Sequence, residues 1–264
     1  MDILLAVIML VLGLAGSFLS GLLGIGGAII NYPLLLFVPP LFGEAGFTAQ
    51  EVSAISMFQV FFASLSGVLF QRRGKNGPSL VHKGLVLYMG GGVLAGSLIG
   101  GLASKYMPGD TINVIYGVLA VIAVVLMLIP AKGKRQKEGA ELAFNKPLAV
   151  LSALAVGLVS GIVGAGGAFI LIPIMLTLLK IPTRTTIASS LAIVFISAVG
   201  GVIGKIGAGH IPLLPVIFTV IGSLLGAPLG SRLSARINVK YLRYALIVLI
   251  AATAVKIWLP ILLQ

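Results

Sequence analysis

Cysteine is absent from this chain of 264 residues, and only six of its residues are acidic. Without thiols, disulfide bonds, thiolate metal sites and cysteine nucleophiles are excluded. The acidic residues fall in polar stretches or at the edges of apolar ones: Asp2, Glu44, Glu51, Asp110, Glu138 and Glu141. Enzymes that work inside membranes need His, Asp, Glu or Cys at depth. We therefore expect that the protein is not an enzyme and holds neither a metal nor a cofactor.

Charged residues of both signs make up only 9% of the chain, whereas hydrophobic residues make up 59% and the mean hydropathy is +1.18. Several apolar runs approach the ~20 residues that cross a bilayer as a helix. They are Ile3–Leu23, Leu85–Leu102, Ile112–Ile129, Pro147–Val163, Leu213–Leu229 and Leu242–Leu259. Transmembrane strands would alternate polar and apolar residues, which these runs do not. The sequence therefore predicts an all-α polytopic membrane protein.

The net charge of +12 comes from Lys and Arg residues that lie mostly in the short segments between apolar runs. A nucleic-acid partner would be one explanation of this charge. Retention of positive loops in the cytoplasm is the better explanation, because it accounts for their placement between spans. We therefore expect a lipid bilayer and no nucleic acid as partner, and a location in the cell (inner) membrane.

The chain repeats itself in the same order along its two halves. The stretch SGLLGIGGAIINYP at 20–33 returns as SGIVGAGGAFILIP at 160–173, an offset of 140. Two later stretches return at shorter offsets: AISMFQVFFASLSG (54–67) as ASSLAIVFISAVGG (188–201), and GVLAGSLIG (92–100) as GSLLGAPLG (222–230). We therefore predict a first transmembrane repeat over 1–130 and a second over 147–264. The polar segment 131–146 between them is predicted to be a cytoplasmic basic linker.

The route of the first 38 residues decides whether the repeats are parallel or inverted. A straight helix over 3–38 would be ~54 Å long, nearly twice the hydrocarbon thickness. If each glycine-bearing segment crosses once, Lys and Arg divide 11 inside to 7 outside. If the chain turns back at the glycines, the division is 15 to 3, with Lys105, Lys205 and Lys256 outside. The second division fits the positive-inside rule better.

The second route gives each half a re-entrant (broken) helical hairpin plus three transmembrane helices. The two repeats then have inverted topology, and both termini are extracytoplasmic. Each glycine cluster breaks a helix, so that the half-helix that follows it begins deep in the membrane with unpaired backbone N–H groups. Two such N-termini would meet near the midplane and hold an anion. Close helix packing is the alternative explanation of the glycines.

The candidate site combines the two glycine clusters with polar side chains nearby. The backbone candidates are Gly24, Gly26, Gly27, Ala28, Gly164, Gly166, Gly167 and Ala168, and the side-chain candidates are Asn31, Ser56, Gln59, Ser189 and Ser190. Asn31 and Gln59 are amides inside apolar segments, and for them a substrate contact and an interhelical hydrogen bond are equally open. Two further glycine triplets, 92/96/100 and 222/226/230, predict helix packing faces.

The duplicated glycine motif with its downstream proline, together with IASSLAIVF after Thr183-Arg184, resembles the sulfite exporter TauE/SafE family over essentially the whole chain. The resemblance implies a cell-membrane transporter for sulfite or small organosulfonates such as sulfoacetate. The site and the repeats predict a secondary transporter with alternating access, in which the membrane potential alone could drive export of an anion. The alternatives left open are an uptake permease or channel for another small anion or a metal ion, and a membrane scaffold. A homo-oligomer is also left open.

Overall fold

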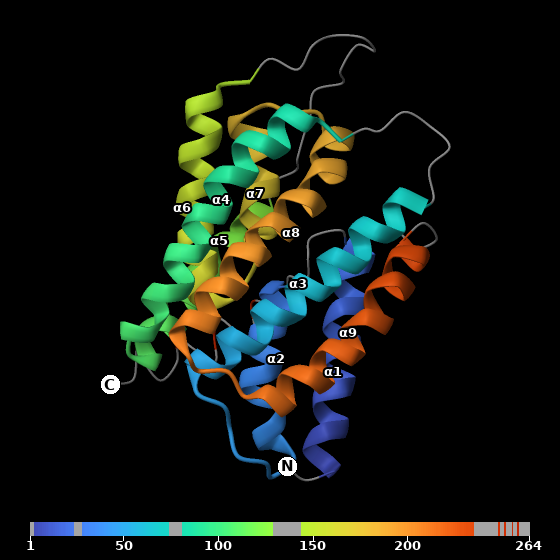
Figure 1. The fold of residues 1–264 in the computed structure, drawn as a ribbon, viewed down its shortest axis with the longest axis vertical. Coiled ribbons are helices and arrows are strands. Elements are labelled where there is room, and N and C mark those ends of the chain that lie inside the picture. The colour runs from blue at the N-terminus through green and yellow to red at the C-terminus, as the bar shows by residue number, and fades with distance from the viewer. Residues whose placement is uncertain are drawn as a thin grey trace.

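The computed structural model describes residues 3–23, 28–73, 81–128 and 144–234, and the single residues Val248, Ala251, Val255 and Trp258. Helices make up nearly all of these residues, and no strand occurs among them. The helices of the first half are α1 (Ile3–Leu23), α2 (Ala28–Leu41), α3 (Ala49–Arg73), α4 (Lys83–Ala103), the short helix η1 (Ser104–Tyr106) and α5 (Gly109–Leu128). The second half forms α6 (Lys146–Val163), α7 (Ala168–Pro173), the π-helical turn η2 (Ile174–Leu178), α8 (Thr183–Ala208) and α9 (Leu213–Ser234) (Figure 1).

Six of the described helices are long and apolar enough to cross a membrane. The spans are Ile3–Leu22, Ala49–Leu69, Lys83–Tyr106, Lys146–Val163, Ser189–Ala208 and Leu213–Leu233. This confirms the predicted all-α polytopic membrane fold. The expected last span, Leu242–Leu259, lies outside the described residues apart from the four single positions, each of which is helical.

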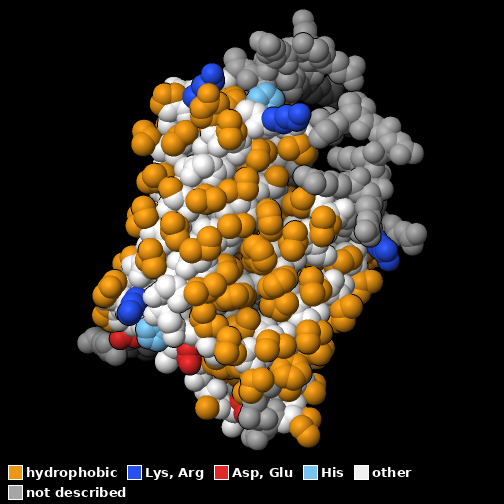
Figure 2. Space-filling view, in the orientation of Figure 1, with side chains coloured by type: hydrophobic (Ala, Val, Ile, Leu, Met, Phe, Trp, Pro, Cys, Tyr) orange, Lys and Arg blue, Asp and Glu red, His pale blue; other side chains and the backbone are white. Residues whose placement is uncertain are grey.

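The surface agrees with contact to lipid. Figure 2 shows apolar side chains over the broad middle of the visible face, with Lys, Arg, His, Asp and Glu toward its ends and margins. Large apolar side chains such as Leu151, Ile203 and Leu225 are more than half exposed. A water-soluble protein would bury such a continuous surface, whereas a bilayer solvates it.

Glycine triplets bring two helix pairs into backbone contact, which confirms the predicted packing faces. On α4, a Cβ added at Gly96 would strike the carbonyl oxygen of Leu154 on α6. On α9, a Cβ added at Gly226 would strike the carbonyl oxygen of Leu14 on α1. Small residues let membrane helices approach until their backbones touch, which increases the dispersion attraction between them.

These two contacts are spaced by the offsets of the sequence repeat. Gly226 follows Gly96 by 130 positions, and Leu154 follows Leu14 by 140, the offsets that the sequence shows. The α4–α6 pair of one bundle therefore has the same register as the α9–α1 pair of the other. The equivalent rings of Phe61 and Phe195 also meet each other where α3 crosses α8, with centroids 5.4 Å apart.

The chain direction of equivalent helices is opposite in Figure 1. Helix α1 begins at the lower end of the view and runs upward, whereas α6 begins at the upper end and runs downward. Helices α4 and α8 also begin at the upper end, and α3 and α9 begin at the lower end. These two ends are called the upper and lower ends below.

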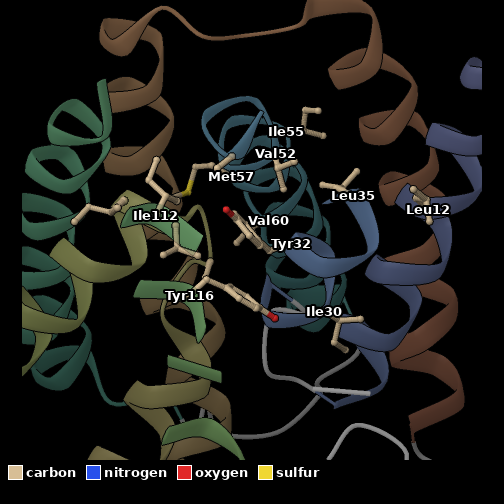
Figure 3. Packing of buried hydrophobic residues seen from close by; sticks show 14 of the residues in the cluster. Leu12, Ile30, Tyr32, Leu35, Val52, Ile55, Met57, Val60, Ile112 and Tyr116 are labelled. Atoms are coloured by element: carbon tan, nitrogen blue, oxygen red, sulfur yellow. The ribbon is translucent and has the colours of Figure 1, made fainter. Parts of the chain in front are cut away.

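A buried core fixes α2 against α5. The rings of Tyr32 and Tyr116 stack with centroids 4.5 Å apart, and the Tyr32 hydroxyl donates a 2.8 Å hydrogen bond to Asn113 Oδ1 (Figure 3). Ile30 and Leu35 pack in the same cluster. This core holds a helix of only 14 residues, which contains three prolines, in a fixed position beside the longer spans.

Candidate functional site

The second glycine cluster forms a buried turn between α6 and α7. Helix α6 ends at Val163, and Gly164 closes it in the left-handed conformation with φ = 78°, its N–H donating to the Ser160 carbonyl at 2.8 Å. Gly166 also has a positive φ, and the Gly167 carbonyl accepts from the Leu171 N–H in the first turn of α7. The helix is therefore broken at the cluster, as the sequence predicts, because left-handed backbone disfavours side chains.

The neighbours of this turn place it at the middle of the spans. A Cβ added at Gly166 would lie 2.6 Å from Val60 Cγ1 and 3.5 Å from Val194 Cγ1. Val60 lies near the midpoint of α3, and Val194 lies near the midpoint of α8. Helix α7 therefore begins at mid-depth, although the last turn of α6 reaches further toward the lower end.

Helix α3 is tied to the same turn by two buried hydroxyls one helical turn apart. Ser53 Oγ donates to the Ile162 carbonyl at 2.6 Å, and Ser56 Oγ donates to the Gly164 carbonyl at 2.9 Å. The Ser56 hydroxyl hydrogen is therefore engaged by the carbonyl of the turn. Ser56 positions the glycine turn, and it can offer a ligand only an acceptor while this bond is intact.

The amides of the first half lie at the same depth on the other side of α3. Gln59 Nε2 donates to the Gly13 carbonyl at 3.1 Å and to Ser17 Oγ at 3.3 Å, which fixes α3 to α1. Asn31, in the first turn of α2, is 2% exposed, and its Oδ1 has no hydrogen-bond partner. Both amides pack against Gly16, where an added Cβ would strike Asn31 Oδ1 and lie 2.9 Å from Gln59 Nε2. A buried unpaired oxygen is costly, so Asn31 remains a candidate for a substrate contact.

The remaining candidates are only partly brought together. Ser189 lies toward the upper end, where its Oγ accepts from the His82 backbone N–H at 3.1 Å. Ser190 is buried and occupies the position equivalent to Ser56. The residues Gly24, Gly26 and Gly27 lie outside the described residues, and Ala28 and Ala168 begin α2 and α7.

Lys205 is the residue that the sequence prediction missed. Its assignment to an outer loop is wrong: Lys205 lies in α8, is 2% exposed, and its Nζ donates to Ser104 Oγ at 2.8 Å and to the Ile162 carbonyl at 2.9 Å. A cationic side chain thus lies close to the glycine turn, because Ile162 comes only two residues before Gly164. The available signal was the length of α8, whose apolar pattern continues beyond Lys205 to Ala208.

Broken helices that begin at mid-depth inside a bundle of apolar spans are typical of one class of protein, the secondary transporters. A family model described as Sulfite exporter TauE/SafE matches residues 8–257. The chain therefore belongs to the TauE/SafE sulfite exporter family.

Curated relatives agree with this class. The chain is 27% identical over 235 residues to "Probable membrane transporter protein YunE" of Bacillus subtilis (strain 168), covering 82% of this chain and 84% of the relative. It is 29% identical to "Probable membrane transporter protein YdhB" of the same organism, with 82% and 85% covered. A third relative, MJ0441 of Methanocaldococcus jannaschii, is 23% identical, with 78% and 74% covered. No solved structure matches significantly. The protein is a membrane transporter and not an enzyme.

Proposed function

We propose that this protein is a secondary transporter that exports sulfite or a small organosulfonate, such as sulfoacetate. The substrate anion is held at mid-depth between the beginnings of α2 and α7, with the glycine clusters supplying backbone N–H donors. The family supports the substrate class. The observation that carries the site is the position of α3, whose adjacent residues Gln59 and Val60 border both half-helix beginnings.

The electrostatic potential at the beginnings of α2 and α7 favours an anion. The first N–H groups of a helix have no intrahelical acceptor, and the helix dipole places about half a positive charge there. Among the described residues, no group of three or more His, Cys, Asp or Glu side chains could hold a metal ion. The candidate side chains Asn31, Ser56, Gln59, Ser189 and Ser190 are neutral, so none of them cancels the positive potential of the helix ends.

The geometry supports inverted repeats that move around this site. Equivalent helices run in opposite directions, and the equivalent rings of Phe61 and Phe195 meet at the crossing of α3 and α8. A pseudo-two-fold axis in the membrane plane would pass through that crossing. Rocking of the α4–α6 bundle against the α1–α9 bundle would then expose the same site to each side in turn.

The upper end is the cytoplasmic one in this proposal. Helices α4, α6 and α8 begin there, and we assign the basic linker 131–146, which leads into α6, to the same side. Correcting Lys205 leaves Lys105 and Lys256 as the only Lys or Arg of the chain assigned to outer loops, which sharpens the charge asymmetry. Because the chain has no cysteine, single cysteines at the two termini can be labelled from outside intact cells; termini that label only after permeabilisation would refute this orientation.

Counterflow in proteoliposomes tests the function. Purified protein should exchange labelled sulfite or sulfoacetate, and an imposed voltage should drive net movement of the anion without a proton or sodium gradient. Exchange that ignores voltage and needs such a gradient would exclude uncoupled export. Movement of a divalent metal ion, with no anion exchange, would instead favour the alternative of a metal permease.

Replacing Asn31 by leucine separates binding from folding. Leucine has nearly the same shape and occurs at the equivalent position, Leu171. Because Asn31 Oδ1 lacks a partner, Asn31→Leu is expected to leave the stability unchanged or raise it by about 1 kcal/mol. Anion affinity is expected to fall about tenfold, because the amide can turn its NH₂ toward the ligand.

The matched control is Gln59→Leu, whose amide already holds Gly13 and Ser17. This variant is expected to lose stability by about 1–3 kcal/mol, since both buried hydrogen bonds between α3 and α1 are lost. Thermal unfolding in detergent, with and without sulfite, measures both quantities. A destabilised Asn31→Leu protein with full sulfite affinity would remove Asn31 from the site.

A further inference from the structure

Lys205 is a buried cation in an apolar span that the central site does not use. Its ammonium lies between η1, α6 and α8. Lys205 is in the last turn of α8, a helix that ends at the lower end of the molecule. An ionisable side chain inside a membrane span is costly and usually faces a partner or a transport route. The charge therefore needs an explanation beyond packing.

The partners of Lys205 do not balance its charge. An ammonium group has three N–H donors, and two are engaged, by Ser104 Oγ and the Ile162 carbonyl. Both acceptors are neutral, and the Ile162 carbonyl also accepts from Ser53 Oγ. Within the described parts of the chain, no carboxylate pairs with Lys205. The dipole at the end of α6 offsets only about half of one charge.

The first repeat has an uncharged residue at the position equivalent to Lys205. At the offset of 134, the residue equivalent to Lys205 is Gln71, whose amide could serve as a neutral donor. A positive charge at this aligned position occurs only in the second half. It lies on the lower side of the glycine turn that opens α7. A cation at this place would attract an anion that passes between the central site and the lower end.

We propose that Lys205 forms a second anion-binding position on the lower side of the central site, where its third N–H binds a small oxyanion. This inference rests on the proposed function, because the oxyanion is the transported substrate. The bound anion supplies the missing negative charge, and the fixed bonds to Ser104 and Ile162 hold the ammonium in place. The position attracts anions to the lower mouth of the route and repels cations.

Lysine ¹⁵N NMR of the full protein in detergent tests this directly, with inorganic sulfite as the probe. The Nζ resonance of Lys205 is identified by its loss in Lys205→Arg, which keeps the charge. Sulfite should move this resonance saturably and leave that of the exposed Lys105 in place. An unmoved Lys205 resonance, at concentrations where sulfite stabilises the protein against heat, would overturn this position and leave the proposed function standing. No stabilisation by sulfite, sulfoacetate, sulfate or thiosulfate would overturn both.

Transport measured from each side provides the second test. Lys205→Gln introduces the residue that the first half has at the equivalent position, and it keeps amide donors. Lys105→Gln is the control, because Lys105 is the neighbour of Ser104 in the chain. In oriented vesicles, Lys205→Gln should raise the half-saturating sulfite concentration about 10- to 100-fold from the lower side only. Lys105→Gln should change neither side. An unchanged half-saturating sulfite concentration in Lys205→Gln would contradict the proposal. An equal increase of this concentration from both sides would contradict it as well.

Discussion

Replacing Gly164 by alanine is expected to abolish transport and to destabilise the protein more than any neighbouring Gly→Ala change. The residue closes α6 at φ = 78°, and an added Cβ would strike the carbonyl oxygen of Ser53. That oxygen belongs to the backbone of α3, which cannot move without shifting the whole span. The left-handed backbone costs about 1–2 kcal/mol with a side chain, and overpacking adds about 1–3 kcal/mol.

Gly43 provides a matched control for the backbone cost. It has φ = 81°, and an added Cβ would meet nothing within 4 Å. Gly43→Ala should therefore lower the melting temperature by only about 2–4 °C, compared with about 10 °C or more for Gly164→Ala. Thermal unfolding in detergent and sulfite counterflow measure the two effects. Gly164→Ala that melts like Gly43→Ala and transports normally would show that the turn does not need its close contact with α3.

Replacing Gly96 by leucine is expected to prevent α4 from packing against α6. The side chain would be driven between α4 and α6, because a Cβ there lies inside the contact distance of the Leu154 carbonyl and 2.7 Å from the Leu158 nitrogen. Overpacking against backbone should cost at least about 3 kcal/mol, since neither helix can yield locally. Gly226→Leu should have the same effect through the equivalent contact of α9 with Leu14.

Gly91 is the control for this pair of variants. It lies on the same helix as Gly96, is exposed, and an added Cβ would meet nothing within 4 Å. Gly91→Leu should leave the yield of monodisperse protein and the melting temperature unchanged, because its side chain would enter lipid. If Gly91→Leu and Gly96→Leu lost the same amount of folded protein, helix propensity rather than close packing would explain the loss.

The sequence was sufficient to predict the membrane class, the helix packing faces and the break at Gly164–Gly167. Apolar runs and small residues at four-residue spacing are properties of a single helix, so they can be recognised without knowing which segments lie beside it. The two glycine triplets pack against Leu154 and Leu14 as their spacing predicts. The left-handed turn at Gly164 was predictable because few other residues adopt that conformation.

The roles of individual polar residues could not be predicted in this way, because they depend on contacts between segments far apart in the chain. Ser56 was a candidate substrate ligand, and the structure shows its hydroxyl holding the Gly164 carbonyl. Lys205 lies near the end of an apolar run, so its sequence position alone predicted an outer loop. Its contacts with Ser104 and Ile162 become visible only in the fold. Asn31 and Gln59 also look alike in sequence, yet only Gln59 has partners for its side-chain donor on α1.

The most direct test of the central claim is an experimental structure of the protein with bound selenite, a sulfite analogue whose selenium is located by anomalous scattering. The account predicts selenium at mid-depth, level with Gln59 and Val60 of α3 and within hydrogen-bonding reach of the first turn of α7. Selenium only at the headgroup level, or away from both half-helix beginnings, would contradict it.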